Sequence, residues 1–211
     1  HELNQRTNAL AWRLMQLGVG PETLVGLAVE KSPELIIGIL GVMKAGGAYL
    51  PLDATYPIDR LIYMIEDSGI RVLLPQRRVA DEIAPQLRTA AQTVVVLDDD
   101  ADLLTEKTLD NPPHRARPLN LAYSIYTSGS TGRPKGTLLQ HLGLSSFVNA
   151  YRGVFKLGPG NRVLQFSSPN FDASIAEIFA SLQSGATLVL ATRDLLLSDT
   201  ALHTLLRDQQ I

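Results

Sequence analysis

Segments with helical spacing of apolar residues alternate with short strand-like segments along almost the whole chain, and this alternation constrains the fold most strongly. Repeated units of this length are typical of a mostly parallel sheet with helices on its faces. In the first half we expect helices over 3–17, 33–44, 58–68 and 78–90, and strands over 23–30, 48–52, 70–74 and 93–97.

Capping residues support these boundaries. Ser32 and Pro33 supply an N-cap and a first helical residue, and Gly69 is a stop signal after an apolar helical face. Ser198 is a candidate cap for a last helix that carries Leu202, Leu205 and Leu206.

A change in composition divides the chain. Residues 98–118 combine an acidic run with three prolines, so we expect a surface connection between a first α/β lobe, 1–97, and a second, 119–211. The run Asp98, Asp99, Asp100 and Asp102 has no glycine-turn spacing, which favours a solvated loop over a metal site. In the second lobe we expect strands over 121–126, 162–167 and 186–191 and helices over 141–151 and 175–183.

Composition excludes several classes of protein. The 19 basic and 21 acidic residues give a net charge of −2, which argues against nucleic acid as the main partner. No apolar run reaches about 18 residues and the start is polar, so we expect no membrane span and a cytoplasmic protein. There is no cysteine, and the pattern H-E-x-x-H fails at Gln5, so no metal site is predicted.

Both ends lie next to helical patterns, and the chain begins with His1 instead of Met. We therefore expect a segment truncated at both ends.

The segment LAYSIYTSGSTGRPKG, residues 121–136, is the most informative for chemistry. Glycines allow backbone N–H groups to approach a polyphosphate, hydroxyls donate to its oxygens, and Lys135 offsets its charge. The spacing differs from the Walker A loop, because Pro134 stands where that motif has glycine. A flexible linker would have a similar composition, but a loop that leaves a buried strand and is stiffened by Pro134 favours phosphate binding.

This whole run resembles the signature phosphate loop of the adenylate-forming superfamily. Residues 42–53 and 171–174 are similar to the second and fourth core motifs of the adenylation domains of nonribosomal peptide synthetases, and the opening HEL is similar to the end of the first. The resemblance spans the chain and implies the front part of the large N-terminal domain of such an enzyme.

For the nucleotide, the resemblance implies ATP with Mg²⁺ and a loop that holds the departing β- and γ-phosphates. Lys135 and Thr131 would act in catalysis. The nucleotide-binding residues would be Thr127, Ser128, Gly129, Ser130, Thr131, Gly132 and Lys135.

The segment FDAS predicts a substrate site. Ser174 and Glu177 match a capping box, which leaves Asp172 free in a strand-to-helix loop or engaged in a local Asx turn. The resemblance implies that Asp172 pairs with the α-ammonium group of an amino acid and that Ala173 and Ala176 line its side-chain pocket.

The implied reaction is formation of an aminoacyl-adenylate and pyrophosphate, followed by transfer to the phosphopantetheine thiol of a carrier domain. The implied partners are the amino acid, the carrier and other synthetase domains, and the rest of the adenylation domain, without which we expect the segment to be inactive. Two alternatives stay open: a stand-alone amino-acid or acyl ligase, and a noncatalytic folding or scaffold subdomain.

Overall fold

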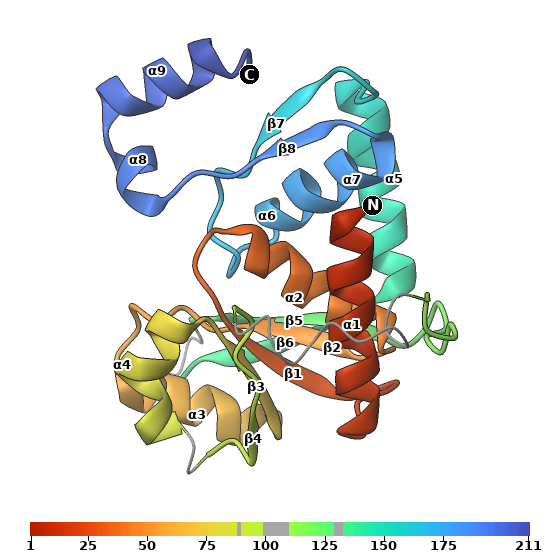
Figure 1. Cartoon of the computed structure of the whole chain (residues 1–211), viewed down its shortest axis with the longest axis vertical. Coiled ribbons are helices and arrows are strands. Elements are labelled where there is room, and N and C mark those ends of the chain that lie inside the picture. Colours follow the sequence, from red (N-terminus) through yellow and green to blue (C-terminus); the bar gives the residue numbers. More distant parts are fainter. Residues whose placement is uncertain (88–89, 99–109, 129–132) are drawn as a thin grey trace. The chain divides into compact units, whose positions relative to one another are not determined.

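The computed structural model describes residues 1–87, 90–98, 110–128 and 133–211, without the side chains of 83–86. The chain divides into two units (Figure 1). Unit 1 comprises His1–Glu30 and Glu34–His141, and unit 2 comprises Lys31–Pro33 and Leu142–Ile211.

Unit 1 is built on a six-stranded sheet in the order β4-β3-β1-β2-β5-β6. Its strands pair in parallel except for β5 and β6, which are antiparallel. The mixed α/β class with a mostly parallel sheet is thus confirmed. The strands are β1 (Leu24–Ala28), β2 (Ala48–Pro51), β3 (Val72–Pro75), β4 (Thr93–Val94), β5 (Leu121–Thr127) and β6 (Lys135–Gln140).

Helices cover both faces of this sheet because side chains alternate along each strand (Figure 1). Leu27 points toward α2, where a Cβ on Gly38 would lie 3.1 Å from it. Leu50 and Leu73 belong to the core cluster that includes residues of α3. The helices are α1 (Glu2–Gln16), α2 (Pro33–Lys44), α3 (Ile58–Ser68) and α4 (Arg77–Leu87).

Close helix packing depends on one glycine. A Cβ built on Gly41 in α2 would lie 2.5 Å from Leu10 of α1, a distance that real contacts do not reach. Glycine therefore allows α1 and α2 to approach each other.

Unit 2 contains a β-α-β arrangement. Strands β7 (Arg162–Leu164) and β8 (Thr187–Val189) pair in parallel, and a helical stretch connects them. That stretch changes geometry twice, from α6 (Ala173–Ile175) through a π-helical turn (Ala176–Ala180) to α7 (Ser181–Ser184). The other helices are α5 (His141–Phe155), α8 (Arg193–Leu197) and α9 (Asp199–Asp208).

Two helix boundaries follow the predicted signals. Gly69 ends α3 in the left-handed conformation, with φ of 67°. The hydroxyl of Ser198 accepts a hydrogen bond from the Ala201 N–H at 3.4 Å at the start of α9. Both capping predictions are confirmed.

The division into units differs from the expected lobes. Residues 119–141, expected in the second lobe, belong to unit 1 because β5 pairs with β2 and β6 pairs with β5. Strand β6 itself was expected as loop. Within the parts of the chain that the structure describes, no helix is long and apolar enough to cross a membrane.

Candidate functional site

The predicted phosphate loop joins β5 to β6 in unit 1. Thr127, the last residue of β5, lies directly opposite Lys135, the first residue of β6. Thr127, Ser128 and Lys135 are exposed. The antiparallel pairing therefore brings together the two ends of the predicted loop; its residues Gly129, Ser130, Thr131 and Gly132 lie outside the described residues.

Tyr126, the residue of β5 just before Thr127, is fixed by a contact that the sequence analysis did not predict. Its hydroxyl donates to Asp67 Oδ2 of α3 at 2.6 Å. Burial, and then the hydrogen bond to Asp67 and the charge of that carboxylate, raise the pKa of Tyr126 well above 10.0. The phenol is therefore neutral at physiological pH and acts as a hydrogen-bond donor.

The ring of Tyr126 lies over Gly136, its cross-strand neighbour. A Cβ on Gly136 would lie 2.9 Å from this ring, so a larger residue would displace the tyrosine. Asp67 also accepts from the Tyr63 hydroxyl at 3.3 Å, and the guanidinium of Arg133 lies 5.9 Å from the Tyr63 ring centroid. The last turns of α3 thus contact Tyr126 before the glycine-rich part of the predicted loop and Arg133 after it.

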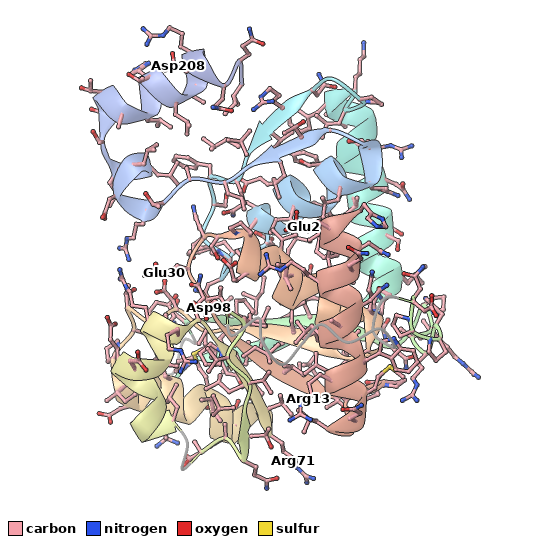
Figure 2. The ribbon with its side chains drawn as sticks, viewed as in Figure 1. Glu2, Arg13, Glu30, Arg71, Asp98 and Asp208 are labelled. Atoms are coloured by element: carbon pink, nitrogen blue, oxygen red, sulfur yellow. The ribbon has the colours of Figure 1, made fainter. Side chains whose placement is uncertain are left out.

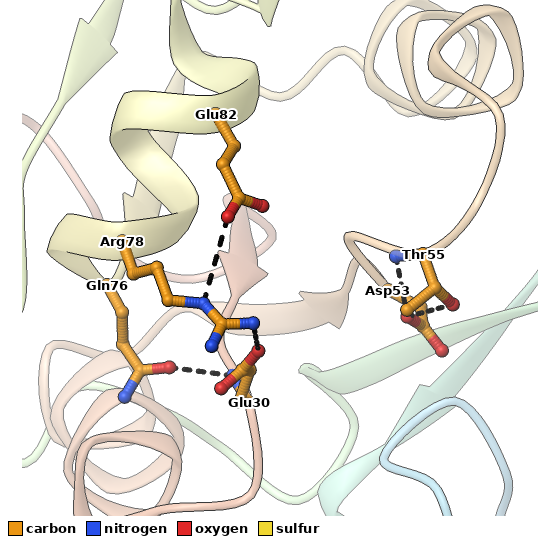
Figure 3. A network of polar contacts seen from close by, with 6 residues as sticks. All are labelled: Glu30, Asp53, Thr55, Gln76, Arg78 and Glu82. Carbon is orange, nitrogen blue, oxygen red and sulfur yellow. Dashed lines mark hydrogen bonds and ion pairs between the residues drawn. The ribbon is translucent and has the colours of Figure 1, made fainter. Parts of the chain in front are cut away.

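Polar side chains gather where the parallel strands of unit 1 end (Figure 3). The N–H of Glu30 donates to Gln76 Oε1 at 2.8 Å, and Arg78 forms an ion pair with Glu30 at 2.8 Å. Asp53 accepts from the N–H and the hydroxyl of Thr55 at 2.9 and 2.7 Å, an Asx turn after β2. Because these groups form hydrogen bonds and ion pairs with one another, we assign them a structural role at this edge of the sheet.

The acidic run contributes a cap. Asp98 Oδ1 accepts from the Arg77 N–H at 2.6 Å at the start of α4, where a carboxylate is favourable. Figure 2 shows Asp98 and Glu30 near each other, with Arg71 at the opposite edge of unit 1. Asp99, Asp100 and Asp102 lie outside the described residues, and among the residues that the structure does describe no cluster of metal-ligating side chains occurs.

In unit 2, Asp172 stands immediately before α6. Its side chain is exposed and makes no capping bond to the helix. Of the two residues predicted to line a pocket, Ala173 is exposed, whereas Ala176 is 1% exposed within the π-helical turn. All three therefore lie at the start of the same helical stretch, with Asp172 and Ala173 open to solvent and Ala176 enclosed.

The predicted capping box is wrong. The N-cap position of α6 is Asp172, so Ser174 lies inside the helix, where its Oγ donates to the Phe171 carbonyl at 2.7 Å. Glu177 accepts instead from the N–H and the hydroxyl of Ser167, at 3.1 and 2.7 Å. The physical reason is that the helix begins at Ala173, two residues earlier than a cap at Ser174 requires, and the Glu177 carboxylate is engaged by Ser167.

Lys31 is a further residue that the sequence analysis missed. Its ammonium group donates to the carbonyl oxygens of Phe166 and, at 3.5 Å, Gln165. Burial lowers the pKa of Lys31, and the negative charge of Glu177 partly offsets this effect. Only the three-dimensional structure brings Lys31 to these carbonyls, because more than 130 residues separate them.

The comparisons with known proteins cover the whole chain. The model of the family described as AMP-binding enzyme matches residues 1–211. The chain is 45% identical to chondramide synthase cmdD of Chondromyces crocatus, over 99% of the chain and 5% of that protein. It is 41% identical to gramicidin S synthase 2 of Brevibacillus brevis, over 100% of the chain and 4% of that protein.

A solved structure has the same fold. The crystal structure of the nonribosomal peptide synthetase FmoA3 in its α-methyl-L-serine-AMP bound form matches with a TM-score of 0.89 and 33% identity. The match covers 100% of this chain and 23% of that one, so the chain spans a minor part of its relatives. The chain belongs to the AMP-binding enzyme family, among the adenylation domains of nonribosomal peptide synthetases.

Proposed function

We propose that this chain is part of a domain that activates an amino acid. The carboxylate of the amino acid attacks the α-phosphate of ATP, which forms an aminoacyl-adenylate and releases pyrophosphate. The phosphopantetheine thiol of a carrier domain then attacks the acyl carbon of the adenylate, which forms a thioester and releases AMP. The observation that carries the proposal is the match of all 211 residues to adenylation domains, with the Gly/Ser/Thr segment lying in the sequence between the paired strands β5 and β6.

In unit 1, the nucleotide phosphates would lie beside the facing ends of β5 and β6. Lys135 and Thr127 lie opposite each other there and are exposed, so both can contact a ligand. We propose that Lys135 stabilises the negative charge that develops on the departing pyrophosphate, together with Thr131. The hydroxyls of Thr127, Ser128 and Ser130 and the N–H groups of Gly129 and Gly132 would donate to phosphate oxygens.

Mg²⁺ usually keeps several water ligands and binds through substrate phosphates with one or two carboxylates. In the part of the chain that the structure describes, the carboxylates form no such cluster, so we derive no catalytic step from them. The metal would screen the phosphate charge when it arrives bound to ATP.

In unit 2, we propose that Asp172 binds the α-ammonium group of the amino acid. Its side chain is exposed and makes no helix-capping bond, so its carboxylate can accept from a ligand. Ala173 and Ala176 would form part of the side-chain pocket. The similar FmoA3 structure is a form bound to α-methyl-L-serine-AMP, an amino acid joined to AMP, which supports an amino-acid substrate for this fold.

Two experiments separate this function from its alternatives. The full-length protein should exchange pyrophosphate into ATP when the right amino acid is present, and the 211-residue chain alone should not exceed a blank without amino acid. Transfer of a labelled amino acid to a carrier domain separates a synthetase from a stand-alone ligase. A full-length protein with no exchange across a panel of protein and nonprotein amino acids, α-methyl-L-serine included, would contradict the proposal and favour the scaffold alternative.

A further inference from the structure

The connection between β7 and α6, residues 165–171, leads directly to Asp172 and is held by two side chains of opposite charge. We propose that Lys31 and Glu177 are positioning residues that fix this connection so that the Asp172 carboxylate is presented to the amino acid. The inference rests on the proposed function only in the role that it gives to Asp172.

Glu177 provides the first anchor, from the π-helical turn. Its carboxylate accepts the Ser167 N–H at 3.2 and 3.1 Å and the Ser167 hydroxyl at 2.7 Å. It also lies 3.4 Å from Gln165 Nε2. Hydrogen bonds to an ionised acceptor are about twice as strong as neutral ones, so this carboxylate can fix the backbone of Ser167.

Lys31 provides the second anchor. Its ammonium group donates to two successive carbonyl oxygens, those of Gln165 and Phe166, and lies 5.9 Å from the Phe166 ring centroid. These two residues follow Leu164, the last residue of β7, so the ammonium group holds the chain where it leaves the strand. Both anchors act on the same three residues, 165–167.

Few apolar side chains of this connection are buried, so the charged side chains of Lys31 and Glu177 contribute more to holding it in place. Phe166 is 52% exposed and Phe171 is 62% exposed. Gln165, at 0% exposed, is fully enclosed, and its Nε2 donates to the Ser167 carbonyl at 2.6 Å. The connection is therefore held by polar contacts more than by burial of apolar side chains.

The two charges also support each other. Lys31 is half-buried, and its burial alone disfavours the charged form, whereas the negative charge of Glu177 favours it. Neutralising Glu177 removes this favourable charge from Lys31. A double variant should therefore cost less than the sum of the two single variants.

The test uses Lys31→Met and Glu177→Gln in the full-length protein, with Lys156→Met and Glu82→Gln as controls because both control residues are exposed. Hydrogen exchange should show faster exchange at residues 165–171, by about tenfold or more at Ser167, as expected on loss of a charge-assisted hydrogen bond. The amides of β1 should keep their rates. The conservative variant Lys31→Arg keeps the donors and should restore protection.

Kinetics provide a second measurement. The KM for the amino acid should rise by about tenfold in either variant, and the KM for ATP should stay within about twofold. Unchanged exchange at 165–171 together with an unchanged KM for the amino acid would overturn the proposal. If the wild type shows no amino-acid-dependent activity, the proposed function fails, but the exchange measurement still decides whether the two charges hold the connection.

Discussion

The two units bury their strands to very different extents. In unit 1 every residue of β2 and β3 and four of the five residues of β1 are buried. In unit 2, β7 is half-buried throughout and β8 buries one residue, Val189. Helices α8 and α9 bury no residue. The central strands of unit 1 are therefore enclosed in an apolar core, whereas the two strands of unit 2 are only partly covered.

This difference extends to the two connections that carry the proposed site. In unit 1, paired strands and the buried Tyr126 fix the ends of the predicted phosphate loop. In unit 2, the side chains of Lys31 and Glu177 fix the connection that leads to Asp172. We therefore expect the backbone of β5 and β6 at the nucleotide side to keep its conformation over a wider range of pH than the connection at the amino-acid side does.

The largest expected effect is on stability, and it compares the two sheets directly. Leu73→Ala, at a position that is 0% exposed in β3, should lower the free energy of unfolding by about 2–5 kcal/mol. Leu188→Ala in β8, where the side chain is half-buried, should lower it by about 1 kcal/mol. Urea denaturation of both variants measures the difference, and equal losses would contradict the comparison of the two units.

Next in size is the effect of Lys135→Ala on adenylation. Removal of this charge should lower kcat for ATP–pyrophosphate exchange by about 10- to 1000-fold, because the lysine acts mainly on charge that develops in the transition state. The KM for the amino acid should change little, since that site is proposed for unit 2. Lys156→Ala is the control. Unchanged kinetics in Lys135→Ala would contradict the catalytic role proposed for this lysine.

Asp172→Ala tests the amino-acid side. A hydrogen bond to a charged group contributes about 1.5–3 kcal/mol, so kcat/KM for the amino acid should fall by about 10- to 150-fold. A carboxylic acid that lacks the amino group has no cation to bind and should lose far less. The measurement is the ratio of kcat/KM for the two substrates, and an unchanged ratio would rule out Asp172 as the partner of the ammonium group.

The smallest effect concerns Tyr126→Phe, which removes the bond to Asp67. Stability at pH 8 should fall by about 1 kcal/mol. The pKa of Tyr126 is raised in the folded chain, so above pH 10 this tyrosine ionises first in the unfolded chain. The stabilisation of the folded chain by the Tyr126 hydroxyl is therefore present below pH 10 and is lost as the pH rises beyond that value. The difference between wild type and variant should therefore shrink above pH 10, with Tyr151→Phe as the control. A constant difference at all pH values would contradict this assignment.

Local signals in the sequence predicted helices well. The segment 33–44 was expected as a helix and is α2, because Pro33 and an apolar run act within the segment itself. Strand β6 was missed because most of its residues are exposed and its side chains show no alternation; its pairing with β5 is what makes it a strand.

Contacts between distant residues explain the errors at the site. The spacing of Ser174 and Glu177 fits a capping box, but the Glu177 carboxylate accepts a hydrogen bond from Ser167 instead. Lys31 and Tyr126 carry no local signal, because their partners come from other elements. The roles of Asp172, Lys135 and the loop residues remain predictions that the kinetics above can test.

The π-helical turn at Ala176–Ala180 has a consequence for evolution and engineering. A π turn holds one residue more than the α-helical turn it replaces, so it acts as an insertion that the helix has absorbed. The Ser181 hydroxyl donates to the Glu177 carbonyl at 2.5 Å, so this carbonyl oxygen of the turn has a hydrogen-bond donor. Deleting one residue here would return this stretch to regular α-helical hydrogen bonding and leave the two flanks close to their present register. Variants that lack this one residue should therefore keep the helix on both sides of it.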